Sequence, residues 1–185
     1  DNIENLNKNS VNALLKIIEE PNEGIFFILI GNNEKNILPT LKSRCLTFKI
    51  NLTFNQSIDI ANQLLNKNIF EHINSDFINY YIAPGEIINL FNLADNKKIN
   101  LLEHNLESLL KLLIDNAYYK KDKVIKKIII KFIELLFLKE YRLTNTKNSL
   151  LNLYHKFLNK IHNVEKFNLD EESLFLEFKS KLLNG

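Results

Sequence analysis

The sequence predicts a mostly α-helical chain with a partial α/β part at its amino-terminal end. Apolar residues recur at helical spacing over most of the chain after Asn55. No glycine or proline interrupts residues 99–184, so long helices can form there. One uninterrupted apolar run, residues 25–30, is rich in Ile and Phe and is bounded by Gly24 and Gly31. Such a run is typical of a parallel strand that is buried on both faces.

The composition indicates an ordinary soluble globular protein, with 45% hydrophobic and 25% charged residues. The net charge of +2 is too small to predict a broad nucleic-acid-binding surface. One cysteine excludes an internal disulfide, and the 4 histidines are too scattered for a metal-ligand cluster. The sequence has no signal peptide, and its most apolar stretch, residues 125–138, is interrupted by Lys126, Lys127, Lys131 and Glu134. We therefore expect a cytoplasmic protein without membrane contact.

The first fifty residues are expected to form a helix, a strand, a short helical turn and a second strand. Four apolar residues at helical spacing predict an amphipathic helix: Val11, Leu14, Leu15 and Ile18. Pro21 ends this helix because proline disfavours helical geometry in the residue before it. The first strand is residues 25–30, Pro39 opens the turn, and residues 45–50 are the second strand.

From residue 51 onward every expected element is a helix. Three short helices come first: residues 53–66, capped by Thr53 or Asn55, then residues 75–82 and 84–93. A polar link at Lys97 and Lys98 leads to four more helices: residues 101–119, 123–143, 146–163 and 170–183. The helix at 123–143 has a wider apolar surface than a surface helix needs, which predicts a place at the centre of a bundle.

Four short signatures follow one another in the first fifty residues. They are Asn-Ala-Leu-Leu-Lys at 12–16, Glu-Glu-Pro at 19–21, Leu-Pro-Thr at 38–40 and Ser-Arg-Cys at 43–45. In this order and spacing, with the apolar run between the second and the third, they resemble the AAA+ clamp-loader subunits of bacterial DNA polymerase III, most of all those of the delta prime type. The tight match covers about the first fifty residues, and beyond them it depends on layout.

The resemblance implies three domains. Residues 1–52 would be part of a RecA-like AAA+ nucleotide-binding domain, residues 53–96 a three-helix lid, and residues 97–185 a helical collar for oligomerisation. The family's phosphate loop, Gly-x-x-x-x-Gly-Lys-Ser/Thr, does not occur in this sequence. Because the chain opens at Asp1 within a motif rather than at Met, we expect a carboxyl-terminal piece that does not hydrolyse ATP by itself.

Arg44 is the residue to which the resemblance assigns chemistry. In the family, the arginine of Ser-Arg-Cys reaches the phosphate of ATP that a neighbouring subunit holds. Arg44, with Ser43 and Cys45 of the motif, would therefore be an arginine finger acting in trans. Arginine suits this role because its planar, permanently charged guanidinium pairs with phosphate oxygens. Outside such a motif, an arginine at this place would more simply be a surface ion-pair partner.

Other family positions are degenerate in this sequence. The Walker B pair falls on Asp1, for which a solvated terminal carboxylate is the favoured explanation, and on Asn2, whose amide is a poor general base. The polar sensor 1 position falls on Asn32 or Asn33, although an asparagine-rich turn explains them equally well. Glu86 occupies the region of the sensor 2 arginine, where an acid would repel phosphate. Glu86 also suits a helix amino terminus.

The resemblance implies a subunit of the DNA polymerase III clamp loader that acts in DNA replication. Its partners would be gamma/tau-type and delta-type subunits in a hetero-oligomeric ring, with the sliding clamp and primer–template DNA reached through the complex. ATP and magnesium would be bound by the neighbouring subunit, and this chain would bind no cofactor. The alternatives are a gamma/tau-type ATP-hydrolysing motor subunit and a helical adaptor with a degenerate AAA+ domain. The lysines between 120 and 131 are interpreted as a solvated helix face rather than a DNA-binding stripe.

Overall fold

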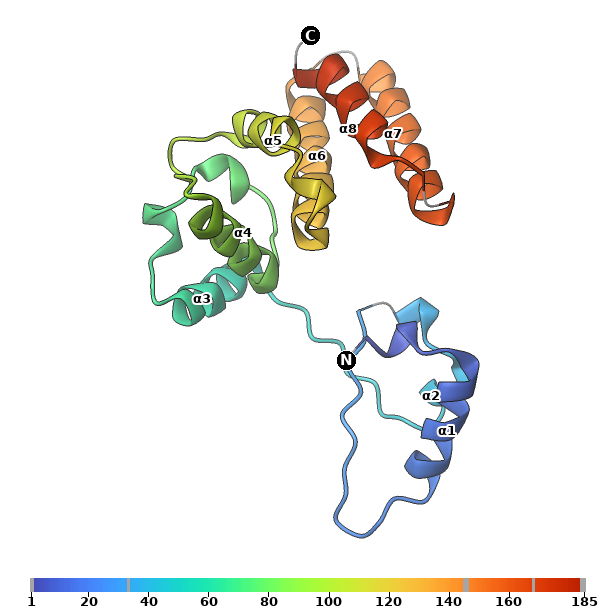
Figure 1. Ribbon diagram of the computed structural model, residues 1–185. Coiled ribbons are helices and arrows are strands. Elements are labelled where there is room, and N and C mark those ends of the chain that lie inside the picture. The colour runs from blue at the N-terminus through green and yellow to red at the C-terminus, as the bar shows by residue number, and fades with distance from the viewer. Residues whose placement is uncertain (1, 33, 145–146, 168, 184–185) are drawn as a thin grey trace. The chain divides into compact units, whose positions relative to one another are not determined.

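The computed structural model describes residues 2–32, 34–144, 147–167 and 169–183. Its contacts divide the chain into two compact units, residues 1–51 and residues 52–185, which Figure 1 shows as ribbons. The described residues form helices joined by turns and extended segments. The mostly α-helical fold class is confirmed.

The first unit is built on helix α1, Lys8–Glu19, and the short helix α2, Pro39–Lys42. The side chain of Asn7 caps α1 by accepting a hydrogen bond from the Ser10 backbone N–H at 2.8 Å. Pro39 stands in the first turn of α2, where its missing N–H costs nothing. Both elements are confirmed. Single turns of 3₁₀-helix, η1 (Ile3–Asn5) and η2 (Glu34–Asn36), lie beside them.

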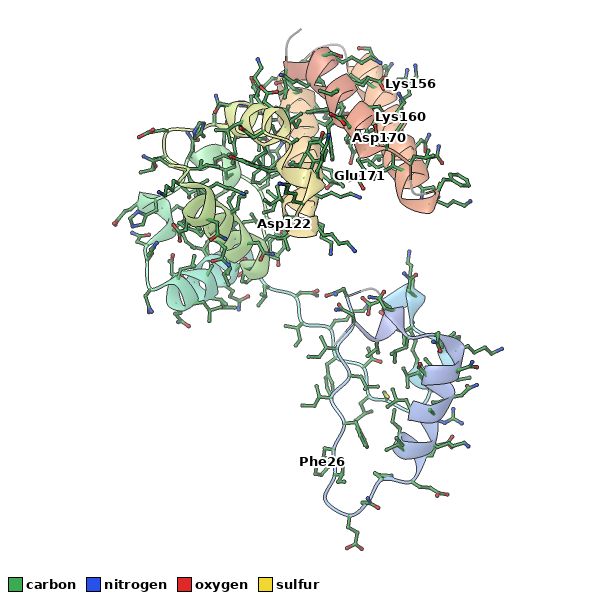
Figure 2. The ribbon with its side chains drawn as sticks, viewed as in Figure 1. Phe26, Asp122, Lys156, Lys160, Asp170 and Glu171 are labelled. Atoms are coloured by element: carbon green, nitrogen blue, oxygen red, sulfur yellow. The ribbon has the colours of Figure 1, made fainter. Side chains whose placement is uncertain are left out.

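The two predicted strands, residues 25–30 and 45–50, are the main error of the sequence analysis. Both segments are extended, but no strand pairing is formed among the described residues. Their apolar side chains are left in solvent, and Phe26 is 91% exposed on the segment that follows α1 (Figure 2). A parallel strand needs hydrogen-bonded neighbours to satisfy its backbone and cover its faces. The apolar pattern is present here, but the pairing is not.

The second unit opens with α3, Phe54–Leu65, and α4, Pro84–Lys97. Thr53 and Gln56 form a capping box at the start of α3: the Gln56 N–H donates to Thr53 Oγ1 at 3.3 Å, and the Thr53 N–H donates to Gln56 Oε1 at 2.9 Å. Helix α4 extends four residues beyond its predicted end at residue 93 and closes at Lys98, which has a left-handed backbone with φ 55°.

The predicted helix at residues 75–82 is wrong. Only a 3₁₀ turn forms there, η4 (Ser75–Phe77), after a similar turn η3 (Ile69–Glu71). The reason lies in tertiary contacts, since the carbonyl of Ile82 accepts a hydrogen bond from the buried hydroxyl of Ser57. This bond holds the chain away from helical geometry in the residues that lead to Pro84.

The carboxyl-terminal helices are α5 (Leu106–Asp115), α6 (Lys123–Leu143), α7 (Lys147–Phe167) and α8 (Glu171–Phe178). Turn η5 (Tyr118–Lys120) precedes α6, and a π-helical turn (Lys179–Leu183) follows α8. Helix α6 has the predicted bounds. Helix α5 is shorter than predicted because Asn105 caps it, accepting from the Ser108 N–H at 2.8 Å. Helix α7 runs past its predicted end at 163, and the predicted start at residue 146 lies outside the described residues.

One hydrophobic core fills the second unit from α3 to the turn after α8. Helix α6 contacts α4, α5 and α7 and buries residues all along its length, among them Ile129, Phe132 and Ile133. The Phe132 ring packs on that of Phe77 with centroids 5.2 Å apart. The predicted central place of α6 is therefore confirmed, and the segments predicted as lid and collar share this core. The three-domain division at 1–52, 53–96 and 97–185 stays a prediction.

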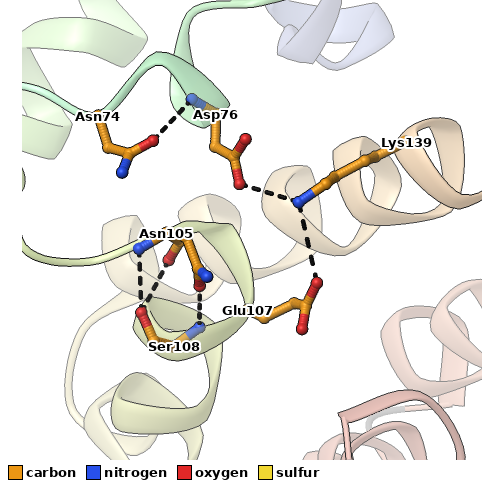
Figure 3. Close-up of polar contacts among 6 residues, drawn as sticks. All are labelled: Asn74, Asp76, Asn105, Glu107, Ser108 and Lys139. Carbon is orange, nitrogen blue, oxygen red and sulfur yellow. Dashed lines mark hydrogen bonds and ion pairs between the residues drawn. The ribbon is translucent and has the colours of Figure 1, made fainter.

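A polar cluster fastens turn η4 to helices α5 and α6 (Figure 3). The Lys139 ammonium lies 3.0 Å from Asp76 Oδ2 and 3.8 Å from Glu107 Oε1. The hydrogen bond from Lys139 to Asp76 raises the pKa of the lysine. Beside it, the Asn74 N–H donates to the Leu101 carbonyl at 3.0 Å. These bonds join segments that are far apart in the sequence.

A second charged cluster joins α7 and α8. The Glu177 carboxylate pairs with Lys160 of α7 and, at 2.6 Å, with Lys181. The hydrogen bonds from these two lysines lower the pKa of Glu177 from 4.5 to about 2.

No helix in the described ranges combines the length and the apolar character that crossing a membrane requires.

We predict that Ser57→Ala lowers the free energy of unfolding by about 1–3 kcal/mol, because the buried Ile82 carbonyl loses its donor. Denaturant unfolding followed by circular dichroism measures this change. Ser75→Ala is the control, since Ser75 is exposed, and we expect it to stay within about 0.5 kcal/mol. Equal effects of the two substitutions would contradict the assigned role of Ser57.

We predict that chymotrypsin first cuts the native chain after Phe26 and Phe48. Both side chains are exposed on extended segments outside the helices, and such segments open to a protease without unfolding a core. Phe132 and Phe175, which are buried, should be cut only after global unfolding. Mass spectrometry of the early fragments tests this order, and early cleavage in α6 or α8 would refute it.

We predict that Glu177 titrates near pH 2 in the folded protein, below its ordinary value of 4.5. A lowered folded-state pKa means that the ion pairs stabilise the fold above about pH 4.5, and that this contribution is lost as the pH falls toward 2. NMR titration of the side-chain carboxyl measures the pKa. Lys160→Ala should raise it, whereas Lys156→Ala, at a neighbouring exposed lysine, should not.

Candidate functional site

Arg44 lies in the turn that follows α2, at the surface of the first unit. Its Nε pairs with the carboxylate of Glu19, the last residue of α1. Its Nη1 donates to the Thr40 carbonyl at 3.0 Å and approaches Ser43 Oγ at 3.3 Å. The side chain remains 39% exposed. An ion pair this open to water contributes about 0–1 kcal/mol to stability, so the guanidinium can exchange partners at little cost.

The other two residues of the motif have local structural roles. Ser43 closes α2, because its N–H donates to the Pro39 carbonyl and its Oγ to the Thr40 carbonyl, both at 3.0 Å. Cys45 is a free, partly buried thiol whose N–H donates to the Lys42 carbonyl at 3.3 Å. The Ser-Arg-Cys sequence therefore forms a hydrogen-bonded turn that presents the arginine between the ends of two helices.

Two other predicted site residues, Asn2 and Asn32, meet although thirty positions separate them. Asn32 Nδ2 donates to Asn2 Oδ1 at 2.7 Å. Next to this bond, the Ile3 N–H donates to the Ile30 carbonyl at 3.1 Å. The expected Walker B and sensor 1 positions are thus in contact. Asp1 and Asn33, the remaining members of the two pairs, lie outside the described residues.

Glu4 is a neighbour of this pair that the sequence analysis missed. Its Oε1 accepts from the Asn32 N–H at 3.1 Å. Hydrogen bonds from its own backbone and from that of Asn32 lower the pKa of the Glu4 carboxyl. The sequence signal that could have pointed to this contact is the glycine at position 31. In the structure, a Cβ at Gly31 would lie 3.1 Å from Glu4 Oε2 and 3.2 Å from an Ile3 side-chain carbon. Glycine permits this close approach.

Glu86 belongs to the second unit and lies in the first turn of α4. Its Oε2 accepts from the Ala83 N–H at 2.9 Å, so that it caps the helix. Its Oε1 lies 3.8 Å from the Lys131 ammonium. This arrangement supplies a structural explanation for an acid at the position where the resemblance led us to expect an arginine.

The first unit thus combines one exposed guanidinium with a neutral pair of amides. The amides of Asn2 and Asn32 can donate and accept hydrogen bonds, but neither can take up a proton as a carboxylate does. Arg44 can pair with phosphate oxygens. Chemically, this arrangement suits contact with a phosphate that another molecule holds better than independent hydrolysis.

Comparison with a family model matches residues 1–53 to the family described as DNA polymerase III, delta subunit. This range contains all the signatures at residues 12–45 and ends where the first compact unit ends, within two residues. No solved structure matches the chain.

Three curated relatives extend the comparison. DNA polymerase III subunit delta′ of Buchnera aphidicola subsp. Schizaphis graminum is 39% identical over 74 residues, which is 40% of this chain and 22% of the relative. The gamma subunit of the same organism is 36% identical over 107 residues, 56% of this chain and 27% of the relative. The gamma subunit of Buchnera aphidicola subsp. Acyrthosiphon pisum is 32% identical over 139 residues, which is 69% of this chain and 37% of the relative. The matched parts of this chain span 22–37% of the length of these relatives.

We predict that Gly31→Ala loosens the contact between Ile3, Glu4 and Asn32, because the new methyl group must displace its neighbours by a few tenths of an ångström. At a cost of about 1–2 kcal/mol, amide exchange at Ile3 and Asn32 should accelerate by roughly five- to thirtyfold. Hydrogen exchange followed by NMR measures both amides. Gly85→Ala is the control, since a Cβ at Gly85 meets nothing within 4 Å. Unchanged exchange in Gly31→Ala would contradict the close approach.

Proposed function

The chain is a member of the DNA polymerase III clamp-loader family, and we propose that it acts as a delta-prime-type subunit that presents Arg44 to ATP on a neighbouring subunit. The observation that carries this proposal is the state of Arg44 itself. The guanidinium stands at the surface, held by one exposed carboxylate and one helix-end carbonyl.

Exchange of Glu19 for a phosphate is chemically favourable. A triphosphate offers more negative charge than one carboxylate, and its oxygens can accept two parallel hydrogen bonds from a guanidinium. In phosphoryl transfer, charge spreads over the oxygens of the transferred group, and an arginine supplied by a neighbour stabilises that charge. The Glu19 pair then acts as a resting position that keeps Arg44 ordered before the neighbour docks.

The same proposal assigns ATP and magnesium to the neighbouring subunit. Asn2 supports this because an amide at the position of the Walker B base cannot activate water. Glu86 supports it as well, because a carboxylate facing the chain's own nucleotide would repel it. The expected partners are gamma/tau-type and delta-type subunits in a cytoplasmic ring that loads the sliding clamp onto primer–template DNA.

We predict that Arg44→Ala lowers DNA-stimulated ATP hydrolysis at the neighbouring site by about 10³-fold or more. The assay uses reconstituted rings in which only the ATP site that faces this subunit is functional, so that other sites do not mask the loss. Arg44→Lys should be nearly as impaired, because an ammonium keeps the charge but not the planar fork. Ring assembly is checked by size-exclusion chromatography.

Two control variants sharpen this experiment. Lys42→Ala removes a nearby cation that pairs with Glu34 and should leave turnover unchanged. Glu19→Gln weakens the resting ion pair and should leave turnover unchanged or slightly raised. Full turnover by Arg44→Ala in intact rings would refute the arginine finger and favour a helical adaptor.

A gamma/tau-type motor subunit is the second candidate, because the match to one gamma subunit covers 69% of this chain. A motor would hydrolyse ATP without its partners. Turnover by the isolated protein that persists in Arg44→Ala would favour the motor, whereas absence of turnover outside the ring agrees with the delta-prime-type role.

A further inference from the structure

The second unit contains a cavity of about 750 Å³ that no part of the proposed function uses. It lies between the segment at residues 79–81, the second half of α6 and the start of α7. Its volume is within the range of small-molecule and cofactor sites. Four tyrosines and three charged residues distinguish its lining: Tyr80, Tyr81, Tyr141, Tyr154, Lys131, Glu134 and Arg142.

The tyrosine rings of the lining offer flat faces to the cavity. Two of these rings, Tyr80 and Tyr154, pack against neighbouring side chains. The Arg142 guanidinium lies over the Tyr80 ring, 4.6 Å from its centroid. The Tyr154 ring packs against Phe137 with centroids 5.0 Å apart, which fixes it from the core side. Tyr81 is 50% exposed and free to meet a ligand. Aromatic and guanidinium planes of this kind are the usual stacking platforms for unpaired bases.

Glu134 supplies a hydrogen-bond acceptor to the cavity. Its side chain is partly buried, and among the described residues no hydrogen bond or ion pair to its carboxylate is found. Lys131, whose charge also acts on Glu134, lies 3.8 Å from Glu86. Burial raises the pKa of Glu134, and burial together with the charge of Glu134 raises the pKa of Tyr154. A ligand that donates a hydrogen bond here would replace water at this carboxylate.

We propose that this cavity receives a base of single-stranded nucleic acid. The base stacks on the tyrosine and Arg142 planes, Glu134 accepts a hydrogen bond from an exocyclic amino group, and Lys131 and Arg142 pair with the adjoining phosphate. For Lys131, which lines the cavity, this replaces the solvated-face interpretation of the sequence analysis. The proposal does not depend on the proposed function, since Arg44 and its neighbours belong to the other unit.

A peptide fits the same lining less well. A basic side chain that paired with Glu134 would meet the positive charges of Lys131 and Arg142, and an acidic one would meet Glu134. A nucleotide can satisfy the acidic and the basic side chains of this lining with different parts of the same molecule. Its neutral base carries the amino donors, and its phosphate carries the negative charge some ångströms away. Carboxylate oxygens accept hydrogen bonds from the amino group of cytosine, whereas thymine has no such group.

The test is fluorescence anisotropy of labelled 12-nucleotide single strands, oligodeoxycytidylate against oligothymidylate, at equal salt and pH 7.5. The two strands carry the same charge and differ in the exocyclic amine. We expect the cytidylate to bind about five- to tenfold more tightly. Glu134→Leu, which is similar in size but has no acceptor, should abolish this preference. Arg142→Ala and Tyr81→Ala should weaken both strands by at least fivefold.

Lys156→Ala, at an exposed lysine of α7 outside this cavity, is the matched control and should change neither affinity. Tyr81 is exposed, so its substitution keeps the proposal testable even if a variant in α6 fails to fold. Equal binding of the two strands, or loss in Lys156→Ala as large as in Arg142→Ala, would reduce the contact to general electrostatics and overturn the proposal. So would binding that leaves the NMR resonances of the cavity tyrosines unshifted, or no binding at all.

Discussion

Burial of α6 is the interaction on which the rest of the second unit depends. Its apolar residues project in several directions. They are covered by α4 and α5, which precede α6 in the sequence, and by α7, which follows it. Full burial of one large apolar side chain stabilises by about 1.5–3 kcal/mol, so the row formed by Ile129, Phe132, Ile133 and Leu136 outweighs any polar contact nearby. The ion pairs of Lys139 and Glu177 add polar contacts at the edges of this core, joining turn η4 to α5 and α6, and α7 to α8 and the turn after it.

The first unit has no comparable element. Among its described residues only Val11 and Leu41 are buried apolar side chains, and short hydrogen bonds between backbone and polar groups hold it together. Its extended segments expose apolar side chains that a sheet would cover. A small core and an exposed arginine turn are compatible with a unit that is stabilised by other protein chains when it assembles with them.

The two units offer different chemistry for the same biological setting. Arg44 is a cation in a weak, exposed ion pair with Glu19. Its guanidinium is suited to a phosphate that another molecule holds. The cavity beside α6 is concave, aromatic and amphoteric, suited to a ligand with separate neutral and anionic parts. Neither site needs the other, so each can be tested by substitutions that leave the other intact.

The sequence by itself determined most of the helices, the Thr53 cap and the motif that carries Arg44, because periodicity, Thr and Pro signals act locally. It missed the Asn105 cap that shortens α5. It could not determine the strands, since an apolar run becomes a strand only when another segment pairs with it. It also could not show that residues 78–82 leave helical geometry, because the Ser57 hydroxyl that binds Ile82 lies 25 positions away. The contact of Asn2 with Asn32 and the gathering of tyrosines around Glu134 were likewise decided by tertiary structure, which alone brings distant residues together.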